Sequence, residues 1–311
     1  MNASQRAFGV LCAIIAGVSY GTNPLGGLIM YGEGLNPSSV VFYRFVLASA
    51  CFAVIMLMSK ISFKVSLKEL FTLAILGLLF SASALTLFTS FLYMDAGLAS
   101  TIFFIYPIFV ALTMALLFRE KLTTTIIIAI VFTLGGIALL YRGDAEGFSL
   151  KGVLCVLGSA ISYCAYMVVI NQSKIIMSAL KMNFYMAIFC LLGVFLFSLT
   201  TADNHLRPLQ TPVAFMAAIF LAIVPTIISL TFMVKAIKII GSTPTSIIGA
   251  LEPLTAVAIG VLLFNELFTM RMALGITLIL SGVLILIAGS EIKNKVKILL
   301  NNRKKLWRWR N

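Results

Sequence analysis

Charged side chains are scarce in this chain. They make up only 11% of its 311 residues, against about 25% in an ordinary soluble domain. Hydrophobic residues make up 61%, and the mean hydropathy is +1.10. A soluble protein of this length could not hide so much apolar surface from water. The composition therefore excludes a soluble domain and indicates a protein whose solvent is lipid.

Residues that carry metal or nucleophilic chemistry are also few. The chain has a single histidine, His205, which falls in a predicted loop. The cysteines lie inside apolar runs without metal-ligand spacing: Cys12, Cys51, Cys155, Cys164 and Cys190. A phosphate-binding G-x-x-x-x-G-K-[ST] loop is missing, so ATP does not drive this chain directly. We expect no metal ion, no cofactor and no enzymatic activity.

Long apolar runs are what the chain has instead. A membrane-spanning helix needs about 20 apolar residues, and the sequence offers ten candidates. They are residues 8–30, 38–59, 69–92, 98–117, 124–142, 149–170, 182–200, 213–234, 243–264 and 270–290. The first run is too long for a cleaved signal peptide, and we interpret it as a span. The sequence predicts an all-α integral membrane protein with ten transmembrane helices.

The positive charges predict the orientation. Of the 23 lysines and arginines, most fall on the side of the N-terminus, the even-numbered helix ends and the C-terminus. The opposite side holds Arg142, Lys151, Arg207 and Arg271. Cytoplasmic loops carry the excess of Lys and Arg, so we expect both termini in the cytoplasm. The basic tail, residues 293–311, contains Trp307 and Trp309 and suits an anionic membrane surface better than nucleic acid.

Two stretches of sequence recur along the chain. Gly9-Val10-Leu11-Cys12 returns as Gly152-Val153-Leu154-Cys155, and Ser19-Tyr20 returns as Ser162-Tyr163, both 143 residues later. A second match, at an offset of 146, pairs Ser100, Ile102, Pro107, Leu116, Leu117, Phe118, Glu120, Thr123 and Gly136 with Ser246, Ile248, Pro253, Leu262, Leu263, Phe264, Glu266, Thr269 and Gly282. The two matches occur in order and nearly in register, which indicates an internal repeat.

The repeat unit contains five spans, an odd number, so the second copy enters the membrane from the opposite face. Inverted repeats of this kind occur in many secondary transporters, because two oppositely inserted copies can exchange conformations. We therefore predict a first five-helix repeat in residues 1–145, a second in residues 146–292, and the tail in residues 293–311.

A motif shared by the two halves carries a family resemblance. Tyr106-Pro107 is followed by Leu116-Leu117-Phe118-Arg119-Glu120, and Glu252-Pro253 is followed by Leu262-Leu263-Phe264-Asn265-Glu266. The pattern resembles the paired EamA domains of the drug/metabolite transporter superfamily, and Arg44 also matches. The resemblance implies ten helices around a central cavity, alternating access and small metabolites as cargo in a bacterial inner (plasma) membrane. Asp95 departs from it, because the family often has a basic residue in this region.

Two charged residues lie within predicted spans. Arg44 is about 9 Å inside the apolar core, and Glu252 lies near the middle of its span. Intramembrane charges are costly and point to function. Arg44 is a candidate substrate-anion or coupling site, and Glu252 a candidate ligand for a substrate amine or a proton carrier. Their axial separation of about 7 Å leaves open a purely structural Arg–Glu pair.

Prolines and polar side chains indicate where a cavity would lie. Pro107 and Pro253 each remove one helical hydrogen bond in mid-span, and the freed carbonyls must face protein or water. Further candidates within the spans are Tyr106, Asn23, Tyr20 and Tyr163. Pro24 and Pro225 predict additional bends. For each of these residues an ordinary kink or an interhelical hydrogen bond is the structural alternative.

The sequence thus predicts a secondary transporter that exports a small metabolite, an amino acid or a related compound, by alternating access. Its expected partners are that substrate and the lipid bilayer, with proton coupling and the oligomeric state left open. An uncoupled facilitator or channel is the alternative. A membrane-embedded enzyme is less favoured, because it needs clustered His, Asp or Cys near a membrane face.

Overall fold

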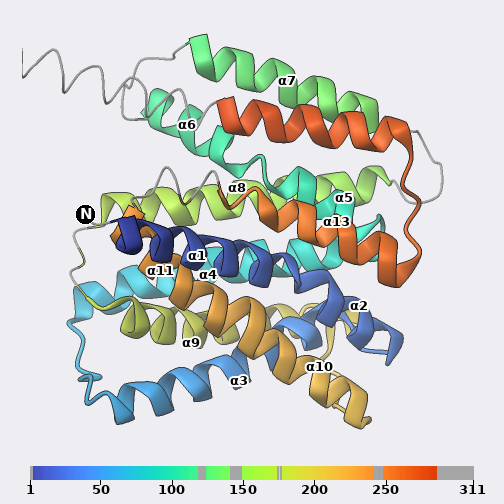
Figure 1. Ribbon diagram of the computed structural model, residues 1–311. Coiled ribbons are helices and arrows are strands. Elements are labelled where there is room, and N and C mark those ends of the chain that lie inside the picture. Colours follow the sequence, from blue (N-terminus) through green and yellow to red (C-terminus); the bar gives the residue numbers. More distant parts are fainter. Residues whose placement is uncertain are drawn as a thin grey trace, which may run out of the picture.

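The computed structural model describes residues 3–117, 124–140, 149–173, 175, 177–240, 245 and 248–285. Within these residues the chain is helical and forms no β-strand (Figure 1). The helices are α1 (Ala3–Gly21), α2 (Asn23–Gly32), α3 (Pro37–Met58), α4 (Leu67–Ser90), α5 (Ala96–Phe103), α6 (Tyr106–Leu117), α7 (Thr124–Leu140), α8 (Leu150–Gln172), α9 (Ala179–Ser198), α10 (Pro212–Ala222), α11 (Ser229–Ile240), α13 (Leu251–Phe264) and a last helix, Met270–Ile285.

Among the residues that the structure describes, seven helical segments are long and apolar enough to cross a membrane. They are Ser4–Gly32, Pro37–Met58, Leu67–Ser90, Ala96–Leu117, Leu150–Ile170, Ala179–Ser198 and Pro212–Met233. Three shorter apolar helices, Ile127–Gly136, Leu251–Phe264 and Met270–Ile285, fall in the other predicted spans. The prediction of an all-helical membrane protein is confirmed, whereas the crossing of all ten segments stays a prediction.

The helix breaks occur near prolines. The first span divides into α1 and α2 at Thr22, two residues before Pro24, and the fourth divides into α5 and α6 just before Pro107. Pro225 lies in a π-helical turn, Ile223–Ile228, between α10 and α11. Each proline lacks the N–H that a continuous helix would use. Pro24, Pro107 and Pro253 each lie in the first turn of the helix that follows the break, α2, α6 and α13, where a helix needs no backbone N–H from the proline.

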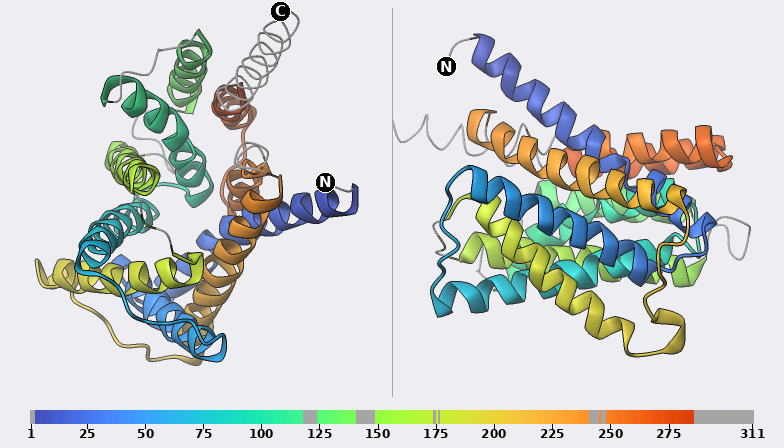
Figure 2. Two further views of the ribbon diagram at one scale, coloured as in Figure 1. Left: turned by 90° about the vertical axis from the view of Figure 1, so that its left-hand side faces the viewer. Right: turned by 90° about the horizontal axis from the view of Figure 1, so that it is seen from below.

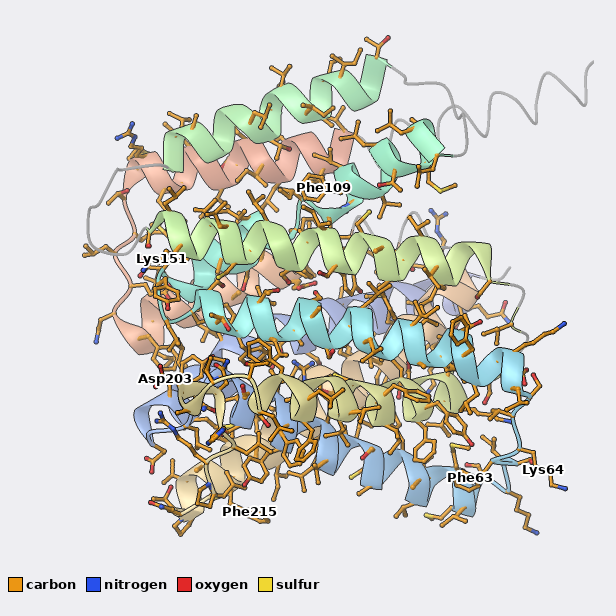
Figure 3. The ribbon with its side chains drawn as sticks, turned by 180° about the vertical axis from the view of Figure 1, so that it is seen from behind. Phe63, Lys64, Phe109, Lys151, Asp203 and Phe215 are labelled. Atoms are coloured by element: carbon orange, nitrogen blue, oxygen red, sulfur yellow. The ribbon has the colours of Figure 1, made fainter. Side chains whose placement is uncertain are left out.

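The two ends of the bundle are distinct. Figure 1 shows the helix axes running along one general direction, with the N-terminus at one end. In the reverse view of Figure 3, Lys64 lies at that end and Lys151 and Asp203 lie at the other. The end-on view in Figure 2 shows α7 at one edge of the bundle and α3 at the opposite edge.

Small and polar side chains join the helices in the interior. Gly17 and Gly21 of α1 pack closely against the chain at Ile248–Thr255. The hydroxyl groups of Ser83 on α4 and Ser159 on α8 lie 3.0 Å apart, and Ser159 also donates to the Ser83 carbonyl at 2.8 Å. These contacts position the side chains of the central helices.

A reciprocal glycine contact joins α7 to the helix Met270–Ile285. A Cβ added to Gly136 would lie 2.7 Å from the carbonyl oxygen of Gly275 and 2.7 Å from Ile279. A Cβ added to Gly282 would lie 2.9 Å from the carbonyl oxygen of Ala129 and 3.0 Å from Thr133. Both helix backbones therefore approach each other at a distance that only glycine permits.

The loop after α9 is fastened to the turn between α2 and α3. Asn36 donates through Nδ2 to the carbonyls of Asp203 and His205 at 2.7 and 2.8 Å. The backbone N–H of Arg207 donates to Ser39 Oγ at 2.7 Å, and its guanidinium donates to the Gly34 carbonyl at 2.7 Å. These long-range bonds satisfy the polar backbone of an otherwise irregular segment.

Candidate functional site

Arg44 lies on α3, and only 2% of its surface is exposed. Its Nε donates to Thr226 Oγ1 at 2.8 Å, and its Nη1 donates to Asn23 Oδ1 at 2.8 Å. The guanidinium carbon also lies 5.2 Å from the ring centre of Phe45 and 6.0 Å from that of Phe88. Three separate segments, α2, α3 and the π-helical turn, therefore meet at one cation.

Pro24 explains why Asn23 is available to Arg44. The carbonyl of Tyr20, four residues before Pro24, loses its normal helical donor because proline has no N–H. The side-chain amide of Asn23 replaces that donor, with Nδ2 2.7 Å from the Tyr20 oxygen. This bond fixes which end of the amide is which, so Oδ1 is the atom that faces Arg44.

Pro225 has the same effect in the second half of the chain. The carbonyl of Leu221 lies four residues before Pro225 and loses its donor in the same way. The hydroxyl of Thr226 donates to that oxygen at 2.8 Å. A threonine hydroxyl has one proton, so Thr226 Oγ1 acts only as an acceptor toward Arg44.

Glu252 lies in the first turn of α13, with Gly21 of α1 packed against its carbonyl oxygen. Its side chain is half-buried and forms no hydrogen bond or ion pair with another described residue. The carboxylate acts electrostatically on the phenol groups of Tyr20, Tyr106 and Tyr163. A carboxylate in this setting is available to a proton or to a cationic ligand.

Aromatic rings cluster around Tyr106 and Tyr163. Tyr106 and Tyr163 meet edge to face with ring centres 4.7 Å apart. Tyr163 also contacts Tyr166 at 5.4 Å and Phe103 at 5.4 Å, and Phe80 contacts Tyr166 at 5.3 Å. The contacts join α4, α5, α6 and α8 around the two tyrosines.

The structure brings most of the predicted site residues together but does not pair the two charges. Arg44 forms no ion pair with Glu252 or with another acid among the residues described. The phenol of Tyr20 is hydrogen-bonded to Arg44 and interacts electrostatically with both charged side chains. Thr226 and Phe80 were not among the predicted candidates. For Thr226 a signal exists in the Pro225-Thr226 dipeptide, because a hydroxyl beside a proline can satisfy the orphaned carbonyl.

A second carboxylate lies outside the spans. Glu266 follows the left-handed residue Asn265 (φ 55°), and its two oxygens accept from the backbone N–H groups of Ala96 and Gly97 at 2.7 and 3.2 Å. The Glu266 carboxylate thus caps the start of α5. Burial and nearby Asp95 raise the pKa of Glu266 to about 7, although the two backbone bonds oppose this shift. Its predicted counterpart, Glu120, lies outside the described residues.

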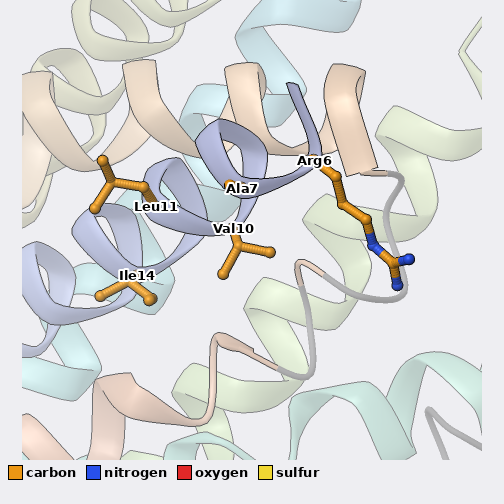
Figure 4. Close-up of a pocket in the computed structure, with 5 residues that line it drawn as sticks. All are labelled: Arg6, Ala7, Val10, Leu11 and Ile14. Carbon is orange, nitrogen blue, oxygen red and sulfur yellow. The ribbon is translucent and has the colours of Figure 1, made fainter. Parts of the chain in front are cut away.

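Two further features of the described residues were compared with this site. Across the described ranges, His, Cys, Asp and Glu side chains form no group of three or more that could hold a metal ion. A surface depression on α1 is lined by Arg6, Ala7, Val10, Leu11 and Ile14 (Figure 4). It contains none of the predicted site residues, and a single helix supplies its whole lining.

Comparisons with known proteins bear on the family and the fold. The profile of the EamA-like transporter family matches residues 7–142 and 150–288. An uncharacterized transporter of Archaeoglobus fulgidus is 28% identical over 133 residues, which cover 42% of this chain and 46% of that relative, about half its length. A crystal structure of a protein with 19% identity superposes with a TM-score of 0.61 over 92% of this chain and 96% of that one. At this identity the structural similarity supports the fold alone.

Proposed function

Because the chain belongs to the EamA-like transporter family, we propose that it is a secondary transporter that exports an amino acid or a related small metabolite by alternating access. The family establishes a membrane transporter that handles small molecules. The substrate, its direction and the mechanism are our proposal. Residues 1–145 and 146–292 are the two inverted halves, with the substrate pocket between them.

The observation that carries the proposal is the equivalence of contacts under the sequence repeat. Gly136 approaches Gly275 and Ile279, and Gly282 approaches Ala129 and Thr133. Adding the repeat offset of 146 to one set of positions gives the other set. A contact in which each partner repeats the role of the other is the signature of a two-fold axis. If the two halves are inverted copies, a two-fold axis must relate α7 to the last helix.

The candidate pocket shows the same equivalence. Tyr20 and Tyr163 correspond at an offset of 143, and Tyr106 and Glu252 correspond at 146. Tyr20 of the first half interacts with Glu252, the residue before Pro253 in the second half. Tyr163 of the second half packs on Tyr106, the residue before Pro107 in the first half. This supports a pocket that either half can expose.

Broken helices near the middle of the bundle also support transport. Secondary transporters commonly bind substrate where spans are discontinuous, because unwound backbone and helix ends provide polar groups in the membrane. The breaks at Thr22, Phe104 and Ile223–Ile228 lie in three different spans. Within this pocket we assign Glu252 to proton coupling, since its carboxylate has no partner among the described side chains.

The orientation belongs to the same proposal. We place the chain in a bacterial inner membrane with both termini in the cytoplasm, on the distribution of Lys and Arg. Single cysteines introduced just after Glu120 and just after Glu266 should react with a membrane-impermeant reagent from opposite sides. Labelling of both from one side would contradict the inverted repeat.

Counterflow in proteoliposomes tests the transport proposal itself. Vesicles loaded with unlabelled amino acids, nucleosides or sugars are diluted into the matching labelled compound. A carrier accumulates label transiently through trans-stimulation, whereas a channel or facilitator without alternating access does not. Empty vesicles are the control. Uptake without trans-stimulation would replace the carrier by the channel alternative.

A further inference from the structure

The helix breaks in the first and eighth predicted spans lie on either side of one cation. The first span divides before Pro24, and the eighth divides at the π-helical turn around Pro225. At each break a side chain satisfies the carbonyl that proline leaves without a donor, Asn23 in the first span and Thr226 in the eighth. Both side chains also accept a hydrogen bond from Arg44. One guanidinium therefore joins the two breaks.

The guanidinium is held by protein groups on several sides. Nε donates to Thr226 and Nη1 donates to Asn23, both at 2.8 Å. The guanidinium also donates to the phenol oxygen of Tyr20. Tyr20 lies on α1, before the first break, and Asn23 lies directly after it, so Arg44 contacts both sides of that break. Arg44 itself is buried on α3, which is continuous from end to end.

The helices beyond the two breaks, α2 and α10, contact each other near the breaks and at their far ends. A Cβ added to Gly26 of α2 would overlap the side chain of Leu221, near the end of α10, so the two helices approach closely there. Thr211, the N-cap residue of α10, donates through its hydroxyl to Glu33 Oε2 at 2.6 Å, directly after α2. A change in the direction of one helix must therefore displace the other.

The corresponding pair of spans is continuous. Under the proposed repeat, α8 corresponds to the first span and α4 to the eighth, and neither helix contains a proline or a break. Ser229 donates to the Ala16 carbonyl at 3.0 Å in the broken pair. Ser159, which corresponds to Ala16 at the offset of 143, donates to the Ser83 carbonyl in the continuous pair. Both pairs thus have a serine contact between helices, and the pair beside Arg44 has the two breaks.

We propose that Arg44 is a positioning residue that couples the break before Pro24 to the π-helical turn around Pro225, so that α2 and α10 change direction together when the transporter changes conformation. Asn23 and Thr226 connect the cation to the two breaks, and the continuous helix α3 is the base from which it acts. This inference rests on the proposed function and adds to it a role for the buried cation.

Hydrogen exchange of the purified protein in detergent, followed by mass spectrometry, tests the coupling. At the first break the backbone N–H groups of Thr22 and Leu25 donate to the carbonyls of Ser19 and Thr22, so their exchange measures opening there. Thr226→Val, which removes only the hydroxyl at the other break, should speed this exchange about 10-fold, the loss typical of a hydrogen bond to a charged group. Thr226→Ser keeps the hydroxyl and should restore the wild-type rate.

A double variant tests whether the connection runs through Arg44. Arg44→Gln should speed exchange at both breaks about 10-fold, and adding Thr226→Val should cause no further change at the first break. Ser159→Ala is the matched control, because it removes the serine contact of the continuous pair and should leave both breaks at the wild-type rate. If Arg44→Gln does not fold, Arg44→Lys replaces it, since lysine keeps the charge without the fork.

Two results of these exchange measurements would overturn the coupling. The first is unchanged exchange at the first break in Thr226→Val. The second is a further increase there of about 10-fold when Thr226→Val is added to Arg44→Gln, because the connection would then run through the packing of α2 on α10.

Transport kinetics separate positioning from ligand binding. The probe is whichever labelled amino acid, nucleoside or sugar gives counterflow with the wild type. Arg44→Gln should lower the maximal counterflow rate about 10-fold or more and change the half-saturation concentration less than about 3-fold. A half-saturation concentration raised by about 30-fold, with the maximal rate kept, would make Arg44 a substrate ligand and overturn the proposal.

The inference and the proposed function fail in different ways. Coupled exchange at the two breaks without counterflow by the wild type would support the coupling and contradict the carrier mechanism. Counterflow by the wild type without coupled exchange would leave the transporter in place and overturn the role of Arg44.

Discussion

The contact between α7 and the last helix makes a sharp prediction, because two neighbouring glycines behave differently there. Gly136 faces the carbonyl of Gly275, and an added Cβ would lie 2.7 Å from it, where ordinary contacts begin at 3.4 Å. The helices would have to separate by about 0.7 Å, an overpacking that typically costs about 1–3 kcal/mol. Gly135, one residue earlier, has nothing within 4 Å of an added Cβ.

Both substitutions gain the same helix propensity, up to about 1 kcal/mol for Gly→Ala. Gly135→Ala should therefore be neutral or stabilising. Gly136→Ala should be less stable than Gly135→Ala by the overpacking term, about 1–3 kcal/mol. Gly282→Ala should show a loss of similar size, because Gly282 makes the reciprocal contact with Ala129.

Reversible unfolding in mixed detergent and SDS micelles, followed by circular dichroism, measures these free energies. Roughly 2 °C per kcal/mol in melting temperature gives an independent check. A Gly136→Ala protein as stable as Gly135→Ala would refute the contact. A large loss at Gly136 with none at Gly282 would refute the two-fold relation between the halves.

Three further predictions concern carboxylates and a hydroxyl. Glu252→Gln should make transport in proteoliposomes independent of pH between about 5 and 8, and an unchanged pH profile would remove Glu252 from coupling. The pKa of Glu266 is raised to about 7 in the folded protein, so the protonated carboxyl group stabilises the folded state. This stabilisation is complete below the ordinary pKa of about 4.5 and is lost as the pH rises toward 7. The melting temperature of the wild type should thus fall more between pH 5 and pH 8 than that of Glu266→Gln, and parallel curves would contradict this. Ser159→Ala should cost about 0.5–1.5 kcal/mol in the same unfolding assay through the lost bond to Ser83, with the exposed Thr277→Ala as control.

The sequence predicted those features of the fold that the lipid environment or backbone hydrogen bonding determines. Apolar runs must be helical in a membrane because their backbone has no other donor, so the helical class and the helices in the predicted spans follow directly. The bends at Pro24, Pro107 and Pro225 follow from the missing N–H groups.

Partner choice in the site could not be predicted in this way. Depth along the membrane normal left an Arg44–Glu252 pair open, because depth says nothing about which helices are neighbours. The structure places Arg44 between Asn23 and Thr226 instead. The two partners lie 21 and 182 positions from Arg44 in the sequence. Only the packing of α2, α3 and the π-helical turn in the folded protein brings them together.

The bonds that fasten the loop after α9 to the turn between α2 and α3 have a consequence for how the protein can be produced. They connect residues far apart in the chain, from Asn36 and Ser39 on one side to Asp203, His205 and Arg207 on the other. Two polypeptides, residues 1–145 and 146–311, co-expressed as separate chains, should therefore still assemble and copurify. Such a split protein would allow one half to be isotopically labelled alone.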